Sequence, residues 1–297
     1  MSSLRFVPQC SKPSVDVLQR FRDVLASVNR FLVLTGAGIS TESGDDLFRI
    51  NSRIPDYRSE KVGQYARSNH RPMDHSTFMK SEKARQRYWS RNAIAWPLFS
   101  KSEPNATHYQ IAKWEMSDRF SWLITQNVDG LHRKAGSKLL TELHGCSHRV
   151  RCMNCNQVYP REEVQQWIMN ANKDWYVSEV GEMAPDGDIA IPDEAVKSFK
   201  LPYCPSCGPG SILKTDVVFF GDCVAGKIVD FCYQKLEESD GILVLGSSLA
   251  VMSGYRFVHK ASLRGMPILI VNIGPTRGDH LATVKLTARC GDIIQSI

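Results

Sequence analysis

Two pairs of cysteines have the spacing of a metal site. Cys152 and Cys155 form one Cys-x-x-Cys turn, and Cys204 and Cys207 form a second. Four thiolates are the ligand set of a tetrahedral structural zinc ion, and they leave no coordination position open for a substrate. A long stretch separates the pairs, but the entropy of loop closure grows slowly with length, so the pairs can still meet. We predict one structural zinc ion, with redox-active or unpaired thiols as the alternative.

A glycine turn and a histidine are the next candidates for chemistry. Residues 36–38 read Gly-Ala-Gly after an apolar run, and such a turn lets backbone N–H groups approach a phosphate. Thr41 occupies the place of the third glycine of the dinucleotide fingerprint, so this is not a standard dehydrogenase loop. A tight turn without a ligand is the alternative. His144 is a candidate general base, although a single histidine is more often structural.

Five short apolar runs predict the elements that position these residues. Strands buried on both faces of a parallel sheet read as continuous apolar runs. Each run ends in small or polar residues, and ligands of open α/β sheets bind outside the carboxyl ends of the strands. We therefore expect a functional site at this edge of a parallel sheet. The runs cover residues 31–34, 122–124, 217–220, 242–245 and 268–271.

Helical periodicity and a change of texture complete the predicted organisation. Apolar residues recur at helical spacing over residues 14–28, and a second helix is expected over residues 81–94. Between residues 148 and 212, prolines and glycines break regular structure around the cysteine pairs, which indicates a separate small lobe. Three polar residues after the second strand are candidate ligand contacts or, alternatively, caps of a helix. They are Gln126, Asn127 and Asp129.

The bulk composition argues against two classes of protein. The chain has 297 residues, a formal net charge of +6 and 42% hydrophobic residues. Its basic residues are dispersed and form no dense run, so we expect no nucleic-acid partner. A zinc-dependent nucleic-acid module would also leave the motifs at the strand ends unexplained. The apolar runs are far shorter than the ~20 residues that cross a bilayer, so we expect no membrane segment.

The order of these motifs resembles the sirtuin family, most strongly its mitochondrial class II members. The resemblance extends from about residue 14 to residue 295. It rests on the two cysteine pairs and on residues 36–40, 126–129, 143–145, 219–222, 246–248 and 272–274. It implies an α/β fold in which a Rossmann-like lobe with a parallel sheet adjoins a smaller zinc-binding lobe. The implied parts are an N-terminal arm (1–13), the Rossmann-like lobe (14–68, 118–148 and 212–297), a helical segment (69–117) and the zinc lobe (149–211).

The resemblance also implies NAD as a consumed co-substrate and an acyl-lysine protein as substrate, both in the cleft between the lobes. The phosphates of NAD would lie against Gly36, Ala37, Gly38 and Ser40, and Asp56 and Arg58 would reach NAD from the following loop. The nicotinamide and its ribose would lie against Gln126, Asn127, Val128 and Asp129. The adenosine half would be held by Gly246, Ser247, Ser248, Asn272, Ile273, Gly274 and Cys290. The substrate backbone would pair with a strand edge formed by Val218, Phe219, Phe220 and Gly221.

The implied reaction breaks the glycosidic bond to nicotinamide, and the acyl oxygen attacks the exposed sugar carbon. His144 is the expected base on a ribose hydroxyl, for which its ordinary pKa of about 6.5 is well matched. Asn127 and Asp129 are the other expected catalytic residues. Tyr88 and Arg91, at i and i+3 of a helix, look like the pair with which relatives read acidic acyl chains, since arginine can hold a carboxylate by two hydrogen bonds. A solvated basic helix is the alternative.

One segment departs from the family pattern. Residues 45–53 intervene where the family runs directly from Gly44 to Ile54. Loop length costs little stability, but Asp56 and Arg58 must then reach NAD from a longer tether. We therefore expect weaker use of NAD than in a version of the chain without this insertion.

The remaining expectations rest on the resemblance alone. Removal of lipoyl, acidic or branched acyl groups is the leading function, with protein ADP-ribosylation and a catalytically weak scaffold that binds NAD and zinc as alternatives. We expect mitochondrial metabolic enzymes as partners, a monomeric state, and a location in the mitochondrial matrix. Residues 1–13 contain no clear presequence, so this location does not rest on a targeting signal.

Overall fold

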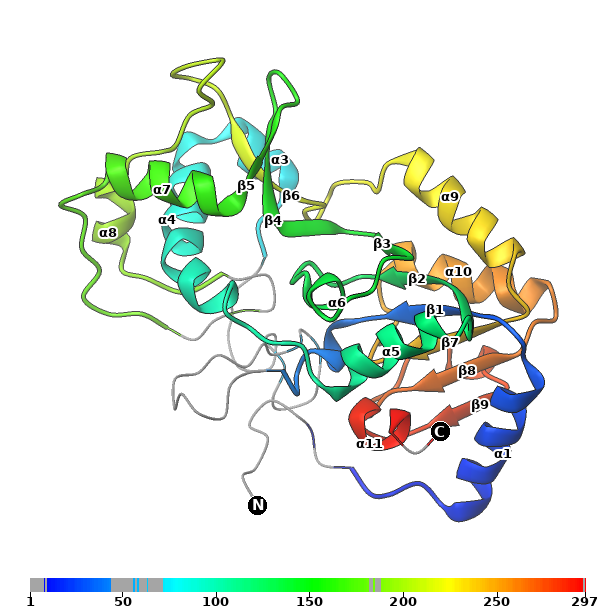
Figure 1. Cartoon of the computed structure of the whole chain (residues 1–297). Helices are drawn as coiled ribbons and strands as arrows, with labels where there is room; N and C mark the ends of the chain where they lie inside the picture. Colours follow the sequence, from blue (N-terminus) through cyan, green and yellow to red (C-terminus); the bar gives the residue numbers. More distant parts are fainter. Residues whose placement is uncertain are drawn as a thin grey trace.

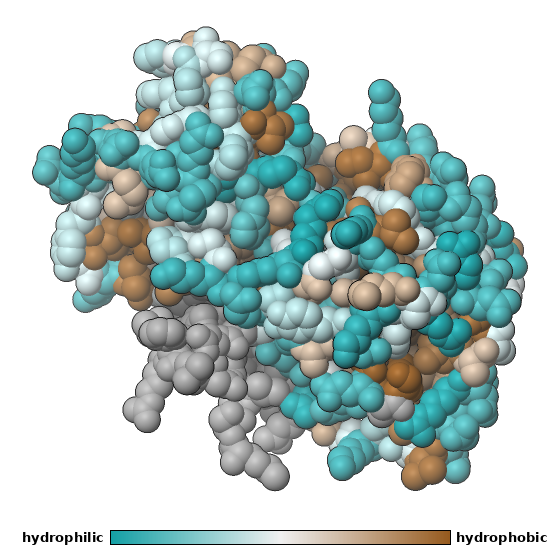
Figure 2. Space-filling model, in the orientation of Figure 1, coloured by the Kyte–Doolittle hydropathy of each residue, from teal (hydrophilic) through white to brown (hydrophobic). Residues whose placement is uncertain are grey.

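The computed structural model describes residues 8, 10–43, 56, 58, 63, 72–181, 184, 188–295 and 297. The insertion at residues 45–53 and most of the N-terminal arm lie outside the described residues. Figure 1 shows two lobes, a large one around a parallel sheet and a small one that carries α7 and α8. Hydrophilic residues cover most of the face in Figure 2, because the large apolar side chains pack into buried clusters.

The large sheet has six parallel strands in the order β3-β2-β1-β7-β8-β9. Every residue of β1, β7 and β8 is buried, which explains their continuous apolar sequences. The strands are β1 (Phe31–Thr35), β2 (Phe120–Thr125), β3 (Leu140–Glu142), β7 (Gly241–Leu245), β8 (Ile268–Val271) and β9 (Val284–Leu286). The predicted α/β fold with a Rossmann-like sheet is confirmed.

Helices cover both faces of this sheet. One face packs on α1 (Val15–Ser27), α5 (Ala106–Met116) and α11 (Cys290–Ile294). The other face packs on α9 (Gly226–Glu237) and α10 (Met252–Leu263). Successive apolar residues of β1, β7 and β8 alternate between these two clusters, as in Val33 and Leu34. Both faces are therefore buried, and ligands are left only the ends of the strands.

The predicted helix over residues 14–28 is α1, which Ser14 caps through a hydrogen bond to the N–H of Val17. The helix predicted over residues 81–94 is α4 (Glu82–Phe99), which Ser81 caps and which continues one turn further. Pro97 lies in that last turn and has no N–H to give to the carbonyl of Ala93. The side chain of Gln165 donates to this carbonyl instead, at 3.0 Å, so the helix can contain the proline.

The small lobe is built on an antiparallel sheet in the order β5-β4-β6. Its strands are β4 (Gly145–Cys152), β5 (Val158–Pro160) and β6 (Leu213–Val217). One cluster of buried side chains joins this sheet to α3 (His75–Lys80), α4 and α7 (Arg161–Ala171), and α8 (Asp193–Ser198) packs against α4. Short helical turns complete the chain at η1 (Ala37–Ile39), α6 (Leu131–Lys134) and η2 (Asp279–Leu281). None of the helices in the described part of the chain combines the length and apolarity needed to cross a membrane.

One predicted strand was wrong. The apolar run at residues 217–220 was expected in the parallel sheet, but β6 ends at Val217 and belongs to the antiparallel sheet of the small lobe. Beyond it, Phe220 makes only an isolated parallel bridge with Asp74. An apolar run indicates burial without indicating which sheet buries it. The strands β3 and β9 were missed because each has three residues, too few for a pattern.

Candidate active site

A cavity of about 1270 Å³ lies where the central strands of the large sheet end and the small lobe begins. The strand order reverses between β1 and β7, which is where open α/β sheets bind ligands. The motifs found in the sequence meet in the wall of this cavity. The predicted residues that line it are Gly36, Ala37, Gly38, Ser40, Asp56, Arg58, Tyr88, Gln126, Asn127, Val128, Asp129, His144, Val218, Phe219, Phe220, Gly221, Gly246, Ser247, Ser248, Asn272, Ile273 and Gly274.

The glycine turn after β1 packs directly on the loop after β7. A Cβ on Gly36 would lie 2.7 Å from the Cβ of Ser247, and a Cβ on Gly38 would lie 2.8 Å from the carbonyl oxygen of Gly246. The N–H of Gly38 donates to that same oxygen at 2.8 Å, and the N–H of Gly36 donates to Leu245. These two N–H groups therefore join the loops and are not offered to a phosphate. The glycines are needed mainly for the close contact of the two loops.

A hydrogen-bonded network fixes the loop after β2 against the glycine turn. The amide of Asn127 donates to the carbonyl of Gly36 and to the hydroxyl of Ser40, each at 3.1 Å. Ser40 in turn donates to the carboxylate of Asp129 at 2.7 Å. Burial raises the pKa of Asp129, although hydrogen bonds from Leu131 and Ser40 oppose this. The three motifs thus form one rigid wall.

Two of the predicted site residues, Asp129 and Gln126, also have structural roles. The carboxylate of Asp129 accepts from the N–H of Leu131 at 3.0 Å, so it holds the first residue of α6 as well as lining the cavity. Gln126 donates to the hydroxyl of Ser247 at 2.8 Å and so connects the loops after β2 and β7. A Cβ on Gly254 would lie 2.6 Å from the side-chain oxygen of Gln126, so this glycine of α10 makes room for it.

His144 lies between the two lobes with both ring nitrogens engaged. Nδ1 is 2.9 Å from the carbonyl oxygen of Gln126, which can only accept, so Nδ1 carries a proton. In the neutral ring Nε2 then has the lone pair and accepts from the hydroxyl of Ser253 at 2.7 Å. Burial lowers the pKa of His144, and the hydrogen bond to Gln126 only partly opposes this. The imidazole is therefore neutral at neutral pH, with its basic nitrogen fixed beside the cavity.

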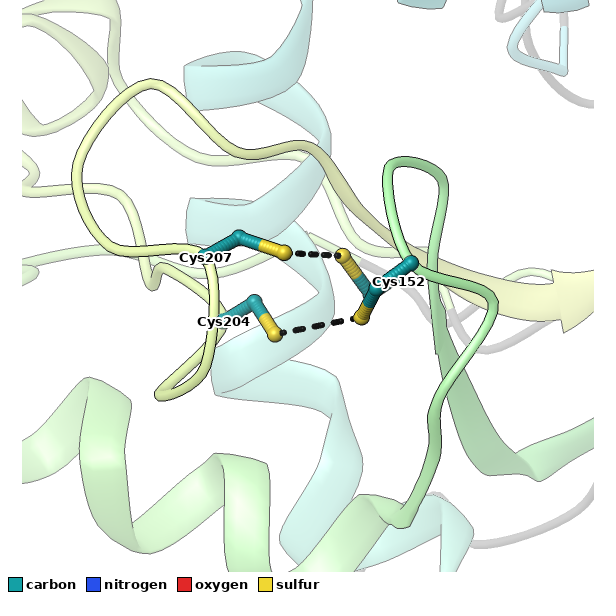
Figure 3. A group of neighbouring side chains, drawn as sticks. Cys152, Cys204 and Cys207 are labelled. Atoms are coloured by element: carbon teal, nitrogen blue, oxygen red, sulfur yellow. Dashed lines mark hydrogen bonds between the residues drawn. The ribbon is translucent and has the colours of Figure 1, made fainter.

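The four cysteines meet at one point of the small lobe, and Figure 3 shows Cys152, Cys204 and Cys207 pointing toward one another. All four sulfur atoms lie within 4.8 Å of one another, with Cys152 to Cys207 at 3.9 Å and Cys155 to Cys204 at 3.8 Å. Zinc–sulfur bonds of about 2.3 Å in a tetrahedron place the sulfur atoms about 3.8 Å apart. These separations fit zinc and are far longer than a disulfide bond. The four predicted ligands therefore form the cluster that a structural zinc ion needs.

Two predicted site residues lie outside the cavity wall. Cys290 is buried at the start of α11, where its thiol is 3.7 Å from the carbonyl of Val271. Arg91 is also buried, and its Nε lies 2.7 Å from the carbonyl of Ile189 and 3.0 Å from the carboxylate of Asp188. The alternative of a solvated helix is therefore wrong for Arg91.

Tyr88 lines the cavity without Arg91. Its hydroxyl lies 2.5 Å from that of Thr215, and its ring packs against Phe219 with the centroids 5.1 Å apart.

The segment after β6 borders the cavity with some backbone groups already bonded. The N–H of Val218 donates to the carbonyl of His144 at 2.8 Å, and the carbonyl of Phe220 accepts from the N–H of His75 at 2.9 Å. This segment and the histidine are thus directly connected.

Sequence reasoning missed Ser253 and Ser147, both of which line the cavity. The signal for Ser253 was weak, because it consists only of a serine near the start of the helix that follows the 246–248 loop.

Comparison with known proteins identifies the class to which this fold and site belong. The family described as the Sir2 family matches residues 36–253 of the chain. This match includes the glycine turn, His144, the cysteine cluster and the 246–248 loop. The chain belongs to the Sir2 family.

Individual relatives agree over nearly the full length. The chain is 50% identical over 295 residues to a Caenorhabditis elegans protein named NAD-dependent protein deacylase sir-2.2, and the match covers 99% of each. It is 49% identical over 290 residues to a Homo sapiens protein named NAD-dependent protein lipoamidase sirtuin-4, mitochondrial, which covers 98% of this chain and 88% of the human one. A solved structure described as Sir2-p53 peptide-NAD+ has a TM-score of 0.69 and 27% identity, and the match covers 94% of this chain and 96% of that one.

Proposed function

We propose that this NAD-dependent protein deacylase uses His144 as the base that activates the ribose of bound NAD. The observation that supports the proposal is the fixed, neutral imidazole whose Nδ1 donates to Gln126 and whose Nε2 lone pair lies beside the cavity. NAD is the co-substrate of the chain, and the glycine turn and the loops after β2, β7 and β8 are the residues that fit it. A neutral base of this kind can accept a proton near pH 7.

The reaction begins when the bond between nicotinamide and ribose breaks and the acyl oxygen of the lysine substrate bonds to the sugar carbon. His144 then takes the proton of the ribose 2′ hydroxyl, and the freed oxygen attacks the acyl carbon. The C–N bond of the amide breaks and one water molecule is consumed, so the products are nicotinamide, free lysine and 2′-O-acyl-ADP-ribose. Asn127 and Asp129 shape the pocket for the nicotinamide end, since both are held by Ser40. Because water would capture the positive sugar carbon, the apolar wall of the cavity protects the step.

The acyl group that fits best is long and apolar, as in a lipoyl chain. The wall beside the small lobe includes Met73, Tyr88, Val217 and Phe219. Arg91, which an acidic acyl group would need, is paired with Asp188. The human relative carries the name lipoamidase, which agrees with this preference. Acidic and branched acyl groups are the alternative substrates. Arg91 could bind their carboxylate only after its ion pair with Asp188 had broken.

A panel of peptides tests this specificity. Lipoyl, glutaryl, succinyl, branched dicarboxyl and acetyl versions of one lysine peptide would be compared by the rate of nicotinamide release. We expect the highest kcat/KM with the lipoyl peptide and the same rates for wild type and Arg91→Ala on it. A preference for acidic peptides that Arg91→Ala abolishes would refute the apolar assignment and support the acidic one.

The name of one relative supports a proposal for the cellular setting. The human protein is named as mitochondrial, and we propose the mitochondrial matrix for this chain, with acyl-lysines of metabolic enzymes as its substrates. We propose that it acts as a monomer, which the molecular mass in solution from light scattering tests. Import of a tagged full-length chain into isolated mitochondria tests the location, and a chain that stays accessible to added protease would refute it.

A further inference from the structure

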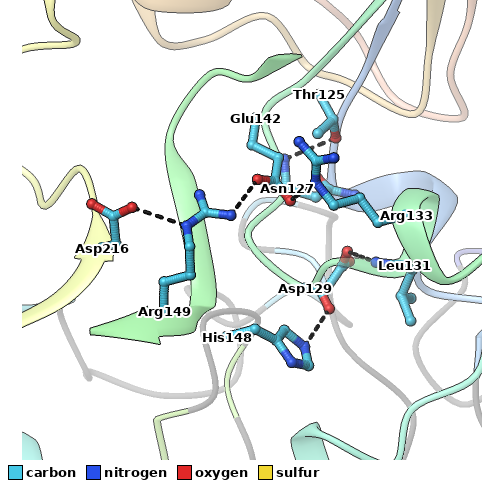
Figure 4. A network of polar contacts seen from close by, with 9 residues as sticks. All are labelled: Thr125, Asn127, Asp129, Leu131, Arg133, Glu142, His148, Arg149 and Asp216. Carbon is cyan, nitrogen blue, oxygen red and sulfur yellow. Dashed lines mark hydrogen bonds and ion pairs between the residues drawn. The ribbon is translucent and has the colours of Figure 1, made fainter. Parts of the chain in front are cut away.

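A row of charged side chains connects the two lobes beside the active site (Figure 4). Glu142 on β3 accepts from Arg149 on β4 at 2.9 Å and pairs with Arg133 of α6 at 3.2 Å. The other side of the Arg149 guanidinium donates from Nε to Asp216 on β6 at 3.0 Å. One arginine thus joins a carboxylate of the large sheet to a carboxylate of the small sheet. We call Glu142, Arg149 and Asp216 the interlobe bridge.

The bridge lies where the backbone ladder of the small sheet is interrupted. The pairing of β4 with β6 shifts register between Cys146 and Val150. In this interval β4 turns toward the loop after β2, where the N–H of Ser147 donates to Val128 at 2.9 Å and the ring of His148 donates to the carbonyl of Asp129 at 3.0 Å. The strand therefore gives up ladder hydrogen bonds in order to contact the NAD side of the cavity. The guanidinium of Arg149 spans the interruption.

Each carboxylate of the bridge lies two residues before a residue of the proposed active site. Glu142 precedes His144 by two residues, and Asp216 precedes Val218 by two residues. The hydrogen bond from Val218 to the carbonyl of His144 connects the same two segments on the cavity side. A backbone hydrogen bond and the interlobe bridge thus both connect His144 to the segment at residues 218–221.

Burial makes this bridge stronger than an ordinary surface pair. The side chain of Glu142 is only 5% exposed, and that of Asp216 is 22% exposed. Burial acts to lower the pKa of Arg149, but the hydrogen bond and charge of Glu142 and the hydrogen bond of Asp216 raise it overall. Burial acts to raise the pKa of Asp216, and Arg151 and Arg149 lower it overall. Glu142 also pairs with Arg133 and Asp216 also pairs with Arg151, so only Arg149 contacts both carboxylates and joins the two sheets.

We propose that Arg149 is a positioning residue, and that the interlobe bridge sets the distance between His144 and the acyl-peptide segment at residues 218–221. The proposal rests on the function proposed above. The bridge would fix the position of the peptide relative to His144. It would not affect the loops of the large lobe that hold NAD. Loss of the bridge should therefore impair the use of acyl peptide and spare the binding of NAD.

Arg149→Met, which keeps the length of the side chain without its charge, tests the proposal. The matched control is Arg151→Met, because Arg151 lies on the same strand and pairs with the same Asp216 at 3.0 Å but has no contact with Glu142 among the described ion pairs. Steady-state kinetics with full-length protein would give KM separately for acyl peptide and for NAD. We expect Arg149→Met to raise the peptide KM or lower kcat on the order of tenfold with the NAD KM within about twofold. Arg151→Met should stay within about twofold of wild type on both.

Further variants separate positioning from a general loss of structure. Arg149→Lys should restore part of the peptide KM, because an ammonium keeps the charge but cannot hold both carboxylates in the same planar geometry. Should Arg149→Met fail to fold, Glu142→Met removes the acceptor of the same link and must give the same peptide-specific defect. Equal effects of Arg149→Met and Arg151→Met, or a parallel rise in both KM values, would overturn the proposal. Absence of acyl-dependent nicotinamide release by the wild type would instead overturn the proposed function.

Discussion

Replacing His144 with asparagine removes the proposed base while preserving one of its hydrogen bonds. The amide nitrogen of asparagine can take the place of Nδ1, which lies 2.9 Å from the carbonyl of Gln126, but no atom takes the place of Nε2. The loop should therefore stay in position and only the basic nitrogen is lost. General base catalysis accelerates a reaction about 10²- to 10⁴-fold, so kcat/KM for the acyl peptide should fall by that factor. This loss corresponds to an activation free energy about 3 to 5 kcal/mol higher.

The pH profile gives this prediction a second signature. Burial lowers the pKa of His144 from 6.5, so the neutral and active form persists below pH 6.5. The acidic limb of kcat/KM in the wild type should lie below pH 6.5, and it should be absent in His144→Asn. The same shift makes the unfolded chain bind a proton more readily than the folded one, so stability should fall as the pH drops below 6.5 and should be unaffected by this group above it.

Nicotinamide release measured from pH 5 to 9, with NAD affinity measured separately by calorimetry, completes the assay. Ser253→Ala is the matched control, since it removes the hydroxyl that donates to Nε2 at 2.7 Å and leaves the base in place. We expect this control to lose less than about tenfold. A rate for His144→Asn within about threefold of wild type, or an unchanged acidic limb, would refute the assignment of the base.

Three further predictions concern the metal, the glycine turn and the insertion. Chelation of zinc or Cys204→Ser should unfold the small lobe and expose the cluster thiols to a thiol reagent, and a chain that keeps its circular dichroism spectrum without zinc would contradict the structural role. Gly38→Ala should weaken NAD binding at least about tenfold, because its Cβ would meet the carbonyl of Gly246, whereas Gly226→Ala, at the first residue of α9 outside the cavity wall and with open space for a Cβ, should change it less than about threefold by calorimetry. Deletion of residues 45–53 should lower the KM for NAD. Unchanged KM and turnover would contradict the prediction that this insertion weakens the use of NAD.

The parallel sheet was predictable because burial on both faces leaves a plain signal in sequence. The runs that became β1, β7 and β8 are apolar at every buried position, and each ends at a motif that lines the cavity. The two Cys-x-x-Cys turns were equally informative, since coordination chemistry fixes the ligand spacing. The strand at residues 217–220 was misassigned because apolarity does not encode the partner strand, which β4 supplies from another lobe.

Contacts between distant segments could not be derived from sequence. Nothing in the local pattern indicates that Ser253 reaches His144 across 109 positions of sequence, or that Asp188 holds Arg91. The resemblance suggested Arg91 as a reader of acidic acyl groups because it lies one turn from Tyr88, yet only Tyr88 lines the cavity. The interlobe bridge was likewise invisible, since its three members lie on three strands and each is unremarkable alone.

Mass spectrometry of the reaction products tests the central assignment most directly. Purified protein would be incubated with NAD and a lipoyl-lysine peptide, and the nicotinamide, free-lysine peptide and nucleotide products would be quantified together. We predict equal amounts of the three, with the nucleotide carrying the acyl group on ADP-ribose, and about 10²- to 10⁴-fold slower formation of all three by His144→Asn. Nicotinamide released without an acyl peptide, or ADP-ribose found attached to protein in place of the acyl-ADP-ribose, would contradict the account.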